Sequence, residues 1–85
     1  MEVTASIREL VVQLTRGNRT EAESLVEALS LFLNDILKSK DDPDSPHMRR
    51  AQQTFFAIEE TRLMLAQQDF NAAIAAARDA VKEWK

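Results

Sequence analysis

The sequence contains no cysteine, so neither a disulfide bond nor a cysteine-ligated zinc site can stabilise it. A single histidine, His47, leaves no histidine cluster for a metal ion. No uninterrupted apolar run approaches the ~18 residues that a membrane-spanning helix needs. The N-terminus also lacks the basic-then-apolar pattern of a secretory signal. We therefore expect a soluble, cytoplasmic protein that uses no metal and no cofactor.

The chain is short for a protein that must hold its fold without cross-links. A domain of this size buries only about 60% of the surface that its unfolded chain exposes, so a lone core is marginal. Small domains compensate with disulfides, a metal ion or a partner subunit, and the composition leaves the partner as the remaining device. We therefore expect one domain, residues 1–85, that self-associates as a homodimer or binds another protein.

Glycine and proline, the residues that interrupt helices, are nearly absent from the chain. Alanine, leucine, glutamate, glutamine and arginine are abundant instead, and no segment alternates apolar and polar residues as a half-buried strand does. The sequence predicts an all-α fold, a small bundle of four helices arranged as two antiparallel helical hairpins. The first hairpin covers about residues 4–39, an acidic loop covers 40–46, and the second hairpin covers about 46–84.

Capping patterns set the expected boundaries of the first hairpin. Ser6, with Glu9 three residues later, has the spacing of a capping box and predicts the start of the first helix. Gly17 tolerates the left-handed conformation that closes a helix. Thr20 and Glu23 repeat the capping-box spacing and predict the start of the second helix.

The boundaries of the second hairpin follow from similar signals. Pro43 prevents the preceding helix from continuing through the loop. Ser45 followed by Pro46 is typical of an N-cap with proline at the first helical position, so we expect the third helix to run from Pro46 to about residue 67. Asp69 predicts the N-cap of the fourth helix.

Each predicted helix carries an apolar face at helical spacing. The face of the first helix consists of Ile7, Leu10, Val11 and Leu14. The second helix has a face wide enough to touch more than one neighbour, made of Leu25, Val26, Leu29, Phe32, Leu33, Ile36 and Leu37. The face of the third helix is formed by Met48, Ala51, Phe55, Ile58 and Leu65, and we expect Phe56 and Leu63 to widen it. The face of the fourth helix is rich in alanine and comprises Phe70, Ala73, Ile74, Ala77, Ala80, Val81 and Trp84.

The net charge of −3 is distributed unevenly along the chain. Residues 20–46 hold seven acidic residues and two lysines, a net charge of −5, whereas residues 1–19 and residues 47–85 each have a net charge of +1. Complementary charge speeds the encounter of two proteins and excludes wrong partners, so the acidic segment suits a basic partner. The predicted partner-binding residues combine the second helix with the acidic loop: Leu25, Leu29, Leu31, Phe32, Leu33, Ile36, Asp41, Asp42 and Asp44.

The acidic loop does not match a calcium-binding loop. Counting from Asp42, Asp44 occupies the third position of an EF-hand, but Pro46 stands at the fifth and Gln53 at the twelfth, where oxygen ligands are required. The loop is better interpreted as solvated acids ahead of a helix N-terminus.

No residue pattern indicates catalysis. His47 lies in the first turn after a proline, with no nucleophile or orienting acid at a suitable spacing. Glu59 and Glu60 are adjacent on a helix, so they point about 100° apart and cannot act on one substrate. We therefore predict that the protein is not an enzyme and has no small-molecule substrate.

Nucleic-acid binding is the alternative function. Two arginine pairs, Arg16 with Arg19 and Arg49 with Arg50, would have to be brought together in a dimer. A helix-turn-helix alignment that places Gly17 in the turn puts Gln13 and Glu23 at positions that need a small and a buried aliphatic residue. The sequence therefore favours a protein–protein interaction module, such as a small adaptor, an inhibitor resembling an antitoxin, or a protein resembling a co-chaperone.

The stretch LMLAQQDFNAAIAAARDAV resembles the helical hairpin of a tetratricopeptide repeat. Asp69 and Phe70 match the turn of that family, and the alanines that follow fall where its small packing residues recur. The tryptophan and glycine of the family's preceding helix are replaced here by Ala57 and Thr61. The turns of the two hairpins are also further apart than one repeat of about 34 residues. The resemblance is confined to the second hairpin and implies helix–helix packing through small residues.

Overall fold

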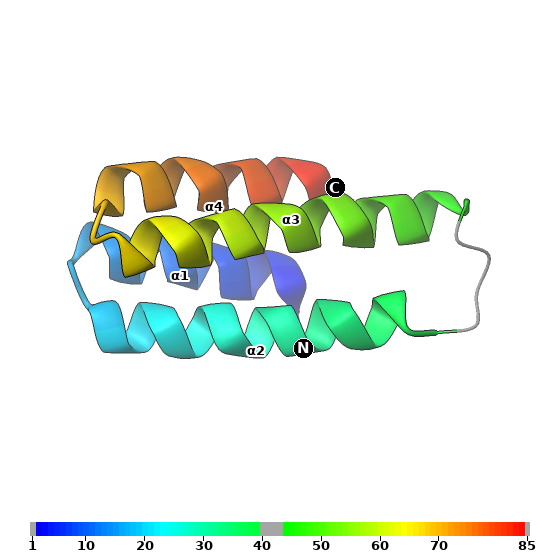
Figure 1. Ribbon diagram of the computed structural model, residues 1–85, viewed down its shortest axis with the longest axis horizontal. Helices are drawn as coiled ribbons and strands as arrows, with labels where there is room; N and C mark the ends of the chain where they lie inside the picture. The colour runs from blue at the N-terminus through cyan, green and yellow to red at the C-terminus, as the bar shows by residue number, and fades with distance from the viewer. Residues whose placement is uncertain (1, 40–43, 85) are drawn as a thin grey trace.

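The computed structural model describes residues 2–39 and 44–84 and shows a bundle of antiparallel helices (Figure 1). In chain order the helices are α1 (Val3–Thr15), α2 (Arg19–Leu37), α3 (Pro46–Ala66) and α4 (Phe70–Trp84). The described residues contain no strand. The predicted all-α class, with four helices in two antiparallel hairpins, is confirmed.

Each helix packs against two neighbours. α1 contacts α2 and α4, and α3 contacts α2 and α4, so α1 lies diagonally across the bundle from α3 and α2 lies diagonally across from α4. α2 and α3 are the longest helices, with 19 and 21 residues, and they extend beyond α1 and α4 at the end opposite the two hairpin turns (Figure 1). No helix in the described part of the chain combines the length and the apolar character that crossing a membrane requires.

The core is built from one face of every helix. Its largest fully buried apolar side chains, each less than 2% exposed, are Ile7, Leu10, Leu14, Leu29, Leu33 and Ile58. α4 contributes small side chains instead, and Ala73, Ala77 and Ala80 are 0% exposed. Because alanine adds little bulk, the α4 backbone approaches α1 and α3 closely while the core stays dense.

The predicted caps of the second hairpin are confirmed. The Ser45 hydroxyl accepts a hydrogen bond from the Met48 backbone N–H at 3.2 Å, with Pro46 as the first helical residue. The Asp69 carboxylate accepts one from the Ala72 N–H at 3.1 Å. Each cap satisfies one of the backbone donors that the first turn of a helix leaves free.

The predicted starts of the first two helices are wrong. α1 begins at Val3, one turn before Ser6, and its cap is Glu2, whose carboxylate accepts from the Thr4 N–H at 3.1 Å. Burial of Val3, which is 3% exposed, against the core adds an apolar contact for this extra turn. α2 begins at Arg19.

The chemistry around Thr20 explains why the second capping box does not form. Asn18 is the N-cap of α2 without a side-chain cap bond, because its amide donates to Gln13 Oε1 at 2.7 Å. Glu23, the expected partner in the box, is bound instead by the Arg19 guanidinium at 2.7 Å.

Both hairpin turns use the same backbone geometry. At the end of α1, the N–H groups of Gly17 and Asn18 donate to the carbonyls of Leu14 and Gln13 at 3.1 and 2.9 Å, and Gly17 has φ +73°. This is a Schellman motif, in which the residue after the helix adopts the left-handed conformation.

The turn after α3 repeats this motif without a glycine. Gln68 and Asp69 donate to Leu65 and Met64 at 3.0 and 2.9 Å, and Gln68 has φ +61°. A side chain in the left-handed region clashes with its own backbone, so this turn is strained where the first one is relaxed.

The two turns therefore predict opposite responses to substitution. Gln68→Gly relieves the backbone clash and should raise the free energy of unfolding by about 0.5–1 kcal/mol. Gly17→Ala introduces the clash and should lower it by a similar amount, although an added Cβ would meet nothing within 4 Å. Urea unfolding followed by the fluorescence of the single tryptophan, Trp84, measures both changes; equal effects of the same sign would contradict this account.

Two buried threonines on α3 differ in how their hydroxyls are satisfied. Both side chains are 0% exposed. The Thr61 hydroxyl donates to the Ala57 carbonyl at 2.8 Å, whereas the Thr54 hydroxyl has no hydrogen-bond partner among residues 2–39 and 44–84. An unpaired buried hydroxyl loses its hydration without compensation.

Thr54→Val keeps the shape of the side chain and removes the unpaired hydroxyl, so it should raise the free energy of unfolding by about 1 kcal/mol. Thr61→Val is the matched control at an equally buried position and should give no gain, because it removes a satisfied hydroxyl. Thermal unfolding by circular dichroism compares the two variants. A larger gain for Thr61→Val than for Thr54→Val would show that the interpretation is wrong.

Candidate functional site

The predicted partner-binding stripe on α2 is divided between the core and the surface. Leu29 and Leu33 are 0% exposed, so in this closed bundle they are not available to a partner. Leu25, Phe32 and Ile36 are half-buried and pack against the core. The wide stripe is therefore largely used within the chain, because α2 contacts both α1 and α3.

The other predicted residues lie outside this stripe. Leu31 is 61% exposed and stands away from the core. Asp44 is exposed at the end of the loop that precedes α3. Asp41 and Asp42 lie outside the described residues.

Two large apolar residues on α3 are also at the surface, and the expectation that they widen the core face is wrong. Phe56 is 68% exposed and Leu63 is 54% exposed, whereas Ile58 on the same helix is fully buried. Steps of about 100° per residue place both side chains on the side of α3 opposite Ile58. The helical geometry of the sequence could have identified them as surface residues.

Leu31, Phe56 and Leu63 together form what we call the outer patch of the α2–α3 hairpin. Leu31 and Phe55 line the groove between the two helices. The ring centroid of Phe55 lies 6.4 Å from that of Phe56. Leu63 follows Phe56 by two helical turns on the same face of α3. Phe56 itself lines the next groove, between α3 and α4, so the patch runs from the α2–α3 groove onto the outer face of α3.

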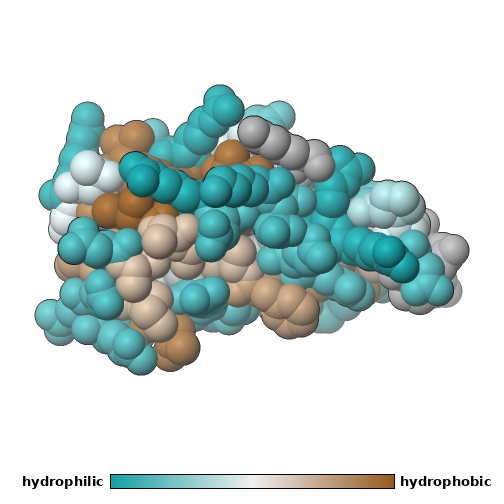
Figure 2. Space-filling model, turned by 90° about the horizontal axis from the view of Figure 1, so that it is seen from above, coloured by the Kyte–Doolittle hydropathy of each residue, from teal (hydrophilic) through white to brown (hydrophobic). Residues whose placement is uncertain are grey.

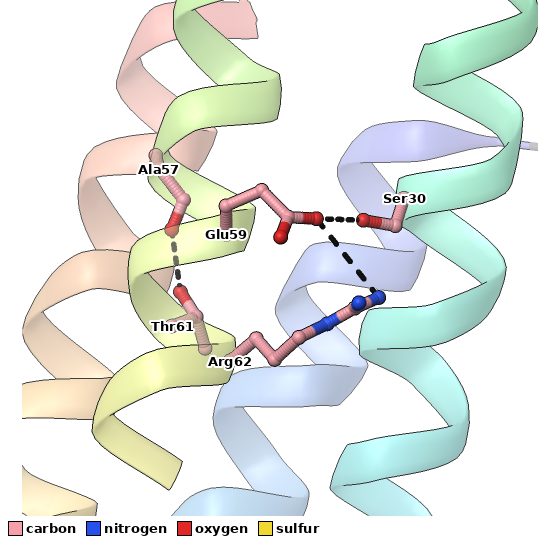
Figure 3. A network of polar contacts seen from close by, with 5 residues as sticks. All are labelled: Ser30, Ala57, Glu59, Thr61 and Arg62. Carbon is pink, nitrogen blue, oxygen red and sulfur yellow. Dashed lines mark hydrogen bonds and ion pairs between the residues drawn. The ribbon is translucent and has the colours of Figure 1, made fainter. Parts of the chain in front are cut away.

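A polar network beside this patch joins α2 to α3 (Figure 3). The Ser30 hydroxyl on α2 donates a hydrogen bond to Glu59 Oε1 on α3. The Arg62 guanidinium lies 3.9 Å from the same oxygen, so the carboxylate is held between a hydroxyl and a cation (Figure 3). Ser30 is 7% exposed, which makes this the more shielded of the two contacts. The network fixes how the two helices that carry the outer patch lie against each other.

The titratable residues Glu59, Glu60 and His47 are held by different neighbours in different parts of the bundle. The Glu59 carboxylate is held by Ser30 and Arg62, while Glu60 lines a different groove, between α3 and α4. The His47 ring packs edge-on against Trp84, with 6.0 Å between ring centroids, and so ties the start of α3 to the end of α4. Across residues 2–39 and 44–84, no three His, Cys, Asp or Glu side chains are grouped closely enough to hold a metal ion.

The four arginines of the nucleic-acid hypothesis do not meet within one chain. Arg16 and Arg19 lie at the α1–α2 turn, and Arg49 and Arg50 lie in the first turn of α3, at the opposite end of the bundle (Figure 1). Arg19 is also paired with Glu23. One chain therefore presents two separate pairs rather than a continuous basic surface.

Comparison with protein-family models, with curated proteins and with solved structures finds no match to this chain.

Ser30→Ala tests whether the polar network holds the two helices together. Loss of a shielded hydrogen bond to a carboxylate should lower the free energy of unfolding by about 1–2 kcal/mol. Arg62→Ala removes an exposed, long ion pair and should lower it by less than about 0.5 kcal/mol. Urea unfolding measures both variants, and equal losses would show that the hydrogen bond contributes no more than the ion pair.

Proposed function

We propose that this protein is a non-enzymatic protein–protein interaction module whose outer patch docks on another protein. The observation that carries the proposal is the exposure of Leu31 beside the groove between α2 and α3, and of Phe56 and Leu63 on the adjoining outer face of α3. Single exposed apolar residues are common on protein surfaces, but neighbouring ones mark interaction sites.

The chemistry of the patch matches that of a binding surface. Aromatic side chains such as Phe56 are enriched at the centre of protein interfaces because they bury a large area and lose little conformational entropy. Burial of a large apolar side chain is favourable by about 1.5–3 kcal/mol, so two or three such residues supply a substantial part of a binding free energy.

The charge beside the patch indicates the kind of partner. Glu27 and Glu59 line the groove between α2 and α3, together with Arg62. Glu27 belongs to the segment 20–46, whose net charge is −5. We infer that the partner places apolar side chains on the outer patch and basic side chains around them, because a complementary rim favours encounter and excludes acidic competitors.

The double variant Leu31→Ser/Phe56→Ser tests this function. Both side chains are exposed, so the substitutions should change the free energy of unfolding by less than about 0.5 kcal/mol and leave the fold intact. In quantitative affinity capture from the native lysate, the proteins enriched by the unmodified chain should be lost from the double variant, and their capture should weaken as salt is raised.

Val12→Ser is the matched control, because Val12 is also exposed, at 39%, but lies on α1. It should retain the captured proteins. Equal capture by the unmodified chain and the Leu31→Ser/Phe56→Ser variant would refute the proposal, as would enrichment of no protein by the unmodified chain.

A further inference from the structure

A groove between α1 and α4 is lined only by basic and apolar side chains. Its volume is about 370 Å³, and its lining residues are Arg8, Val11, Arg78, Val81 and Lys82. The two valines are half-buried and form the floor, while the three cations are exposed. No acidic residue lines this groove, although the chain as a whole carries a net charge of −3.

On the other side of α4, the groove toward α3 has the opposite charge. It has a volume of about 450 Å³ and is lined by Gln53, Phe56, Ala57, Glu60, Asp79 and Glu83. Its charged residues are all acidic. Phe56, at 68% exposure, stands at its edge as an uncovered apolar side chain.

The charges on α4 are sorted by sign into two rows. Arg78 and Lys82 are four residues apart on the side of α1, and Asp79 and Glu83 are four residues apart on the side of α3. Like charges at this spacing destabilise a helix, whereas opposite charges would stabilise it.

The neighbouring helices increase the like-charge repulsion in each groove. α1 adds the cation Arg8 to the basic groove, and α3 adds the anion Glu60 to the acidic groove. None of the six charged side chains in the two grooves forms an ion pair with another residue of the described ranges 2–39 and 44–84. Within the described part of the chain, each groove therefore holds three like charges that no ion pair neutralises.

We propose that the partner that compensates them is a second copy of this chain, bound head to tail. The α3–α4 edge of one copy lies against the α1–α4 groove of the next. Three anions then face three cations, and Phe56 covers the apolar floor of Val11 and Val81. This assignment follows from charge complementarity, because the chain carries both the basic groove and an acidic, partly apolar edge that matches it.

The position of the two rows on α4 allows the basic row of one copy to face the acidic row of the next. Arg78 and Asp79 are adjacent in sequence, as are Lys82 and Glu83, so the two rows stand at the same height along the bundle. Viewed from above, onto the side where α4 lies in Figure 1, apolar groups gather toward the end with the hairpin turns (Figure 2).

The contact joins two different surfaces, so each copy engages one neighbour on either side of α4, and the assembly closes into a ring or continues as a filament.

Self-assembly through α4 deepens the proposed function, since it names one partner of the interaction module. It shares Phe56 with the outer patch but does not use Leu31 or Leu63. If it fails, the docking of another protein on the outer patch is unaffected. The test below leaves all three residues of the outer patch unchanged for this reason.

Charge reversal and mixing test the proposal. Arg78→Glu/Lys82→Glu gives both grooves a net negative charge, and Asp79→Lys/Glu83→Lys gives both a net positive charge. In light scattering at low salt over a wide concentration range, the unmodified chain should form a species above the monomer mass that dissociates as salt is raised. Each variant alone should be monomeric, and their equimolar mixture should recover the larger species. Circular dichroism verifies that both variants remain folded.

Arg8→Glu provides a second test that does not alter α4. It places an anion beside Arg78 and Lys82, so it should raise the melting temperature of the monomer while abolishing assembly. If Arg8 had a purely structural role, stability and assembly would change in the same direction. Arg49→Glu, the same change of charge at the far end of α3, should leave assembly intact. Three results would each overturn the proposal. The unmodified chain could be monomeric at every concentration in low salt, either double variant could assemble alone, or the mixture could stay monomeric.

Discussion

The close packing of α4 against both α1 and α3 is the contact on which the rest of the structure depends. α4 closes the bundle, because it joins the first helix of the chain to the second hairpin. This requires side chains that fill space without separating the backbones, and Ala73, Ala77 and Ala80 meet that requirement with no exposed surface. The large leucines and isoleucines of the core come mainly from the other helices, so bulk and close approach are divided between different parts of the chain.

The same closure determines the character of the surface. α4 contributes mainly small residues to the core. Its charged residues lie along the two grooves that it shares with α1 and α3. The topology then decides which charges meet: α1 brings a cation to one side of α4 and α3 brings an anion to the other. A hydrogen bond between Ser30 and Glu59 joins α2 to α3, and Leu31, Phe56 and Leu63 of these two helices stay exposed. The two surfaces thus arise from two different kinds of helix contact.

The sequence predicts the fold well where local chemistry decides it. Four helices follow from apolar periodicity, and the caps at Ser45 and Asp69 follow from side chains that have no competing partner. The starts at Ser6 and Thr20 could not be predicted in this way. Burial of Val3 against the core adds a turn to α1. Near Thr20, the Asn18 amide is bound to Gln13 across the turn, and Glu23 is bound to Arg19 within α2.

The candidate surfaces were predictable only in part, for a related reason. An apolar stripe has the same chemistry whether its neighbour belongs to the same chain or to another, so Leu29 and Leu33 could not be assigned to the core from the sequence. Leu31 does not belong to the apolar stripe of α2, and its side chain is exposed accordingly. The rows of like charge on α4 are visible in the sequence, but the addition of Arg8 and Glu60 to them depends on which helices become neighbours.

A small bundle under selection for its own stability alone would place opposite charges four residues apart and keep large apolar side chains inside. This chain does so at Arg19 and Glu23, which form an ion pair at 2.7 Å, and departs from it along both sides of α4. It also leaves Phe56 uncovered while burying an unpaired hydroxyl at Thr54. A small protein has little stability to spare. Because most substitutions at an unfavourable surface position would improve stability, such a feature is expected to persist only where function requires it. We propose a binding partner as the common physical explanation for the like-charge rows and the outer patch, since it would supply the opposite charge to the first and the apolar cover to the second.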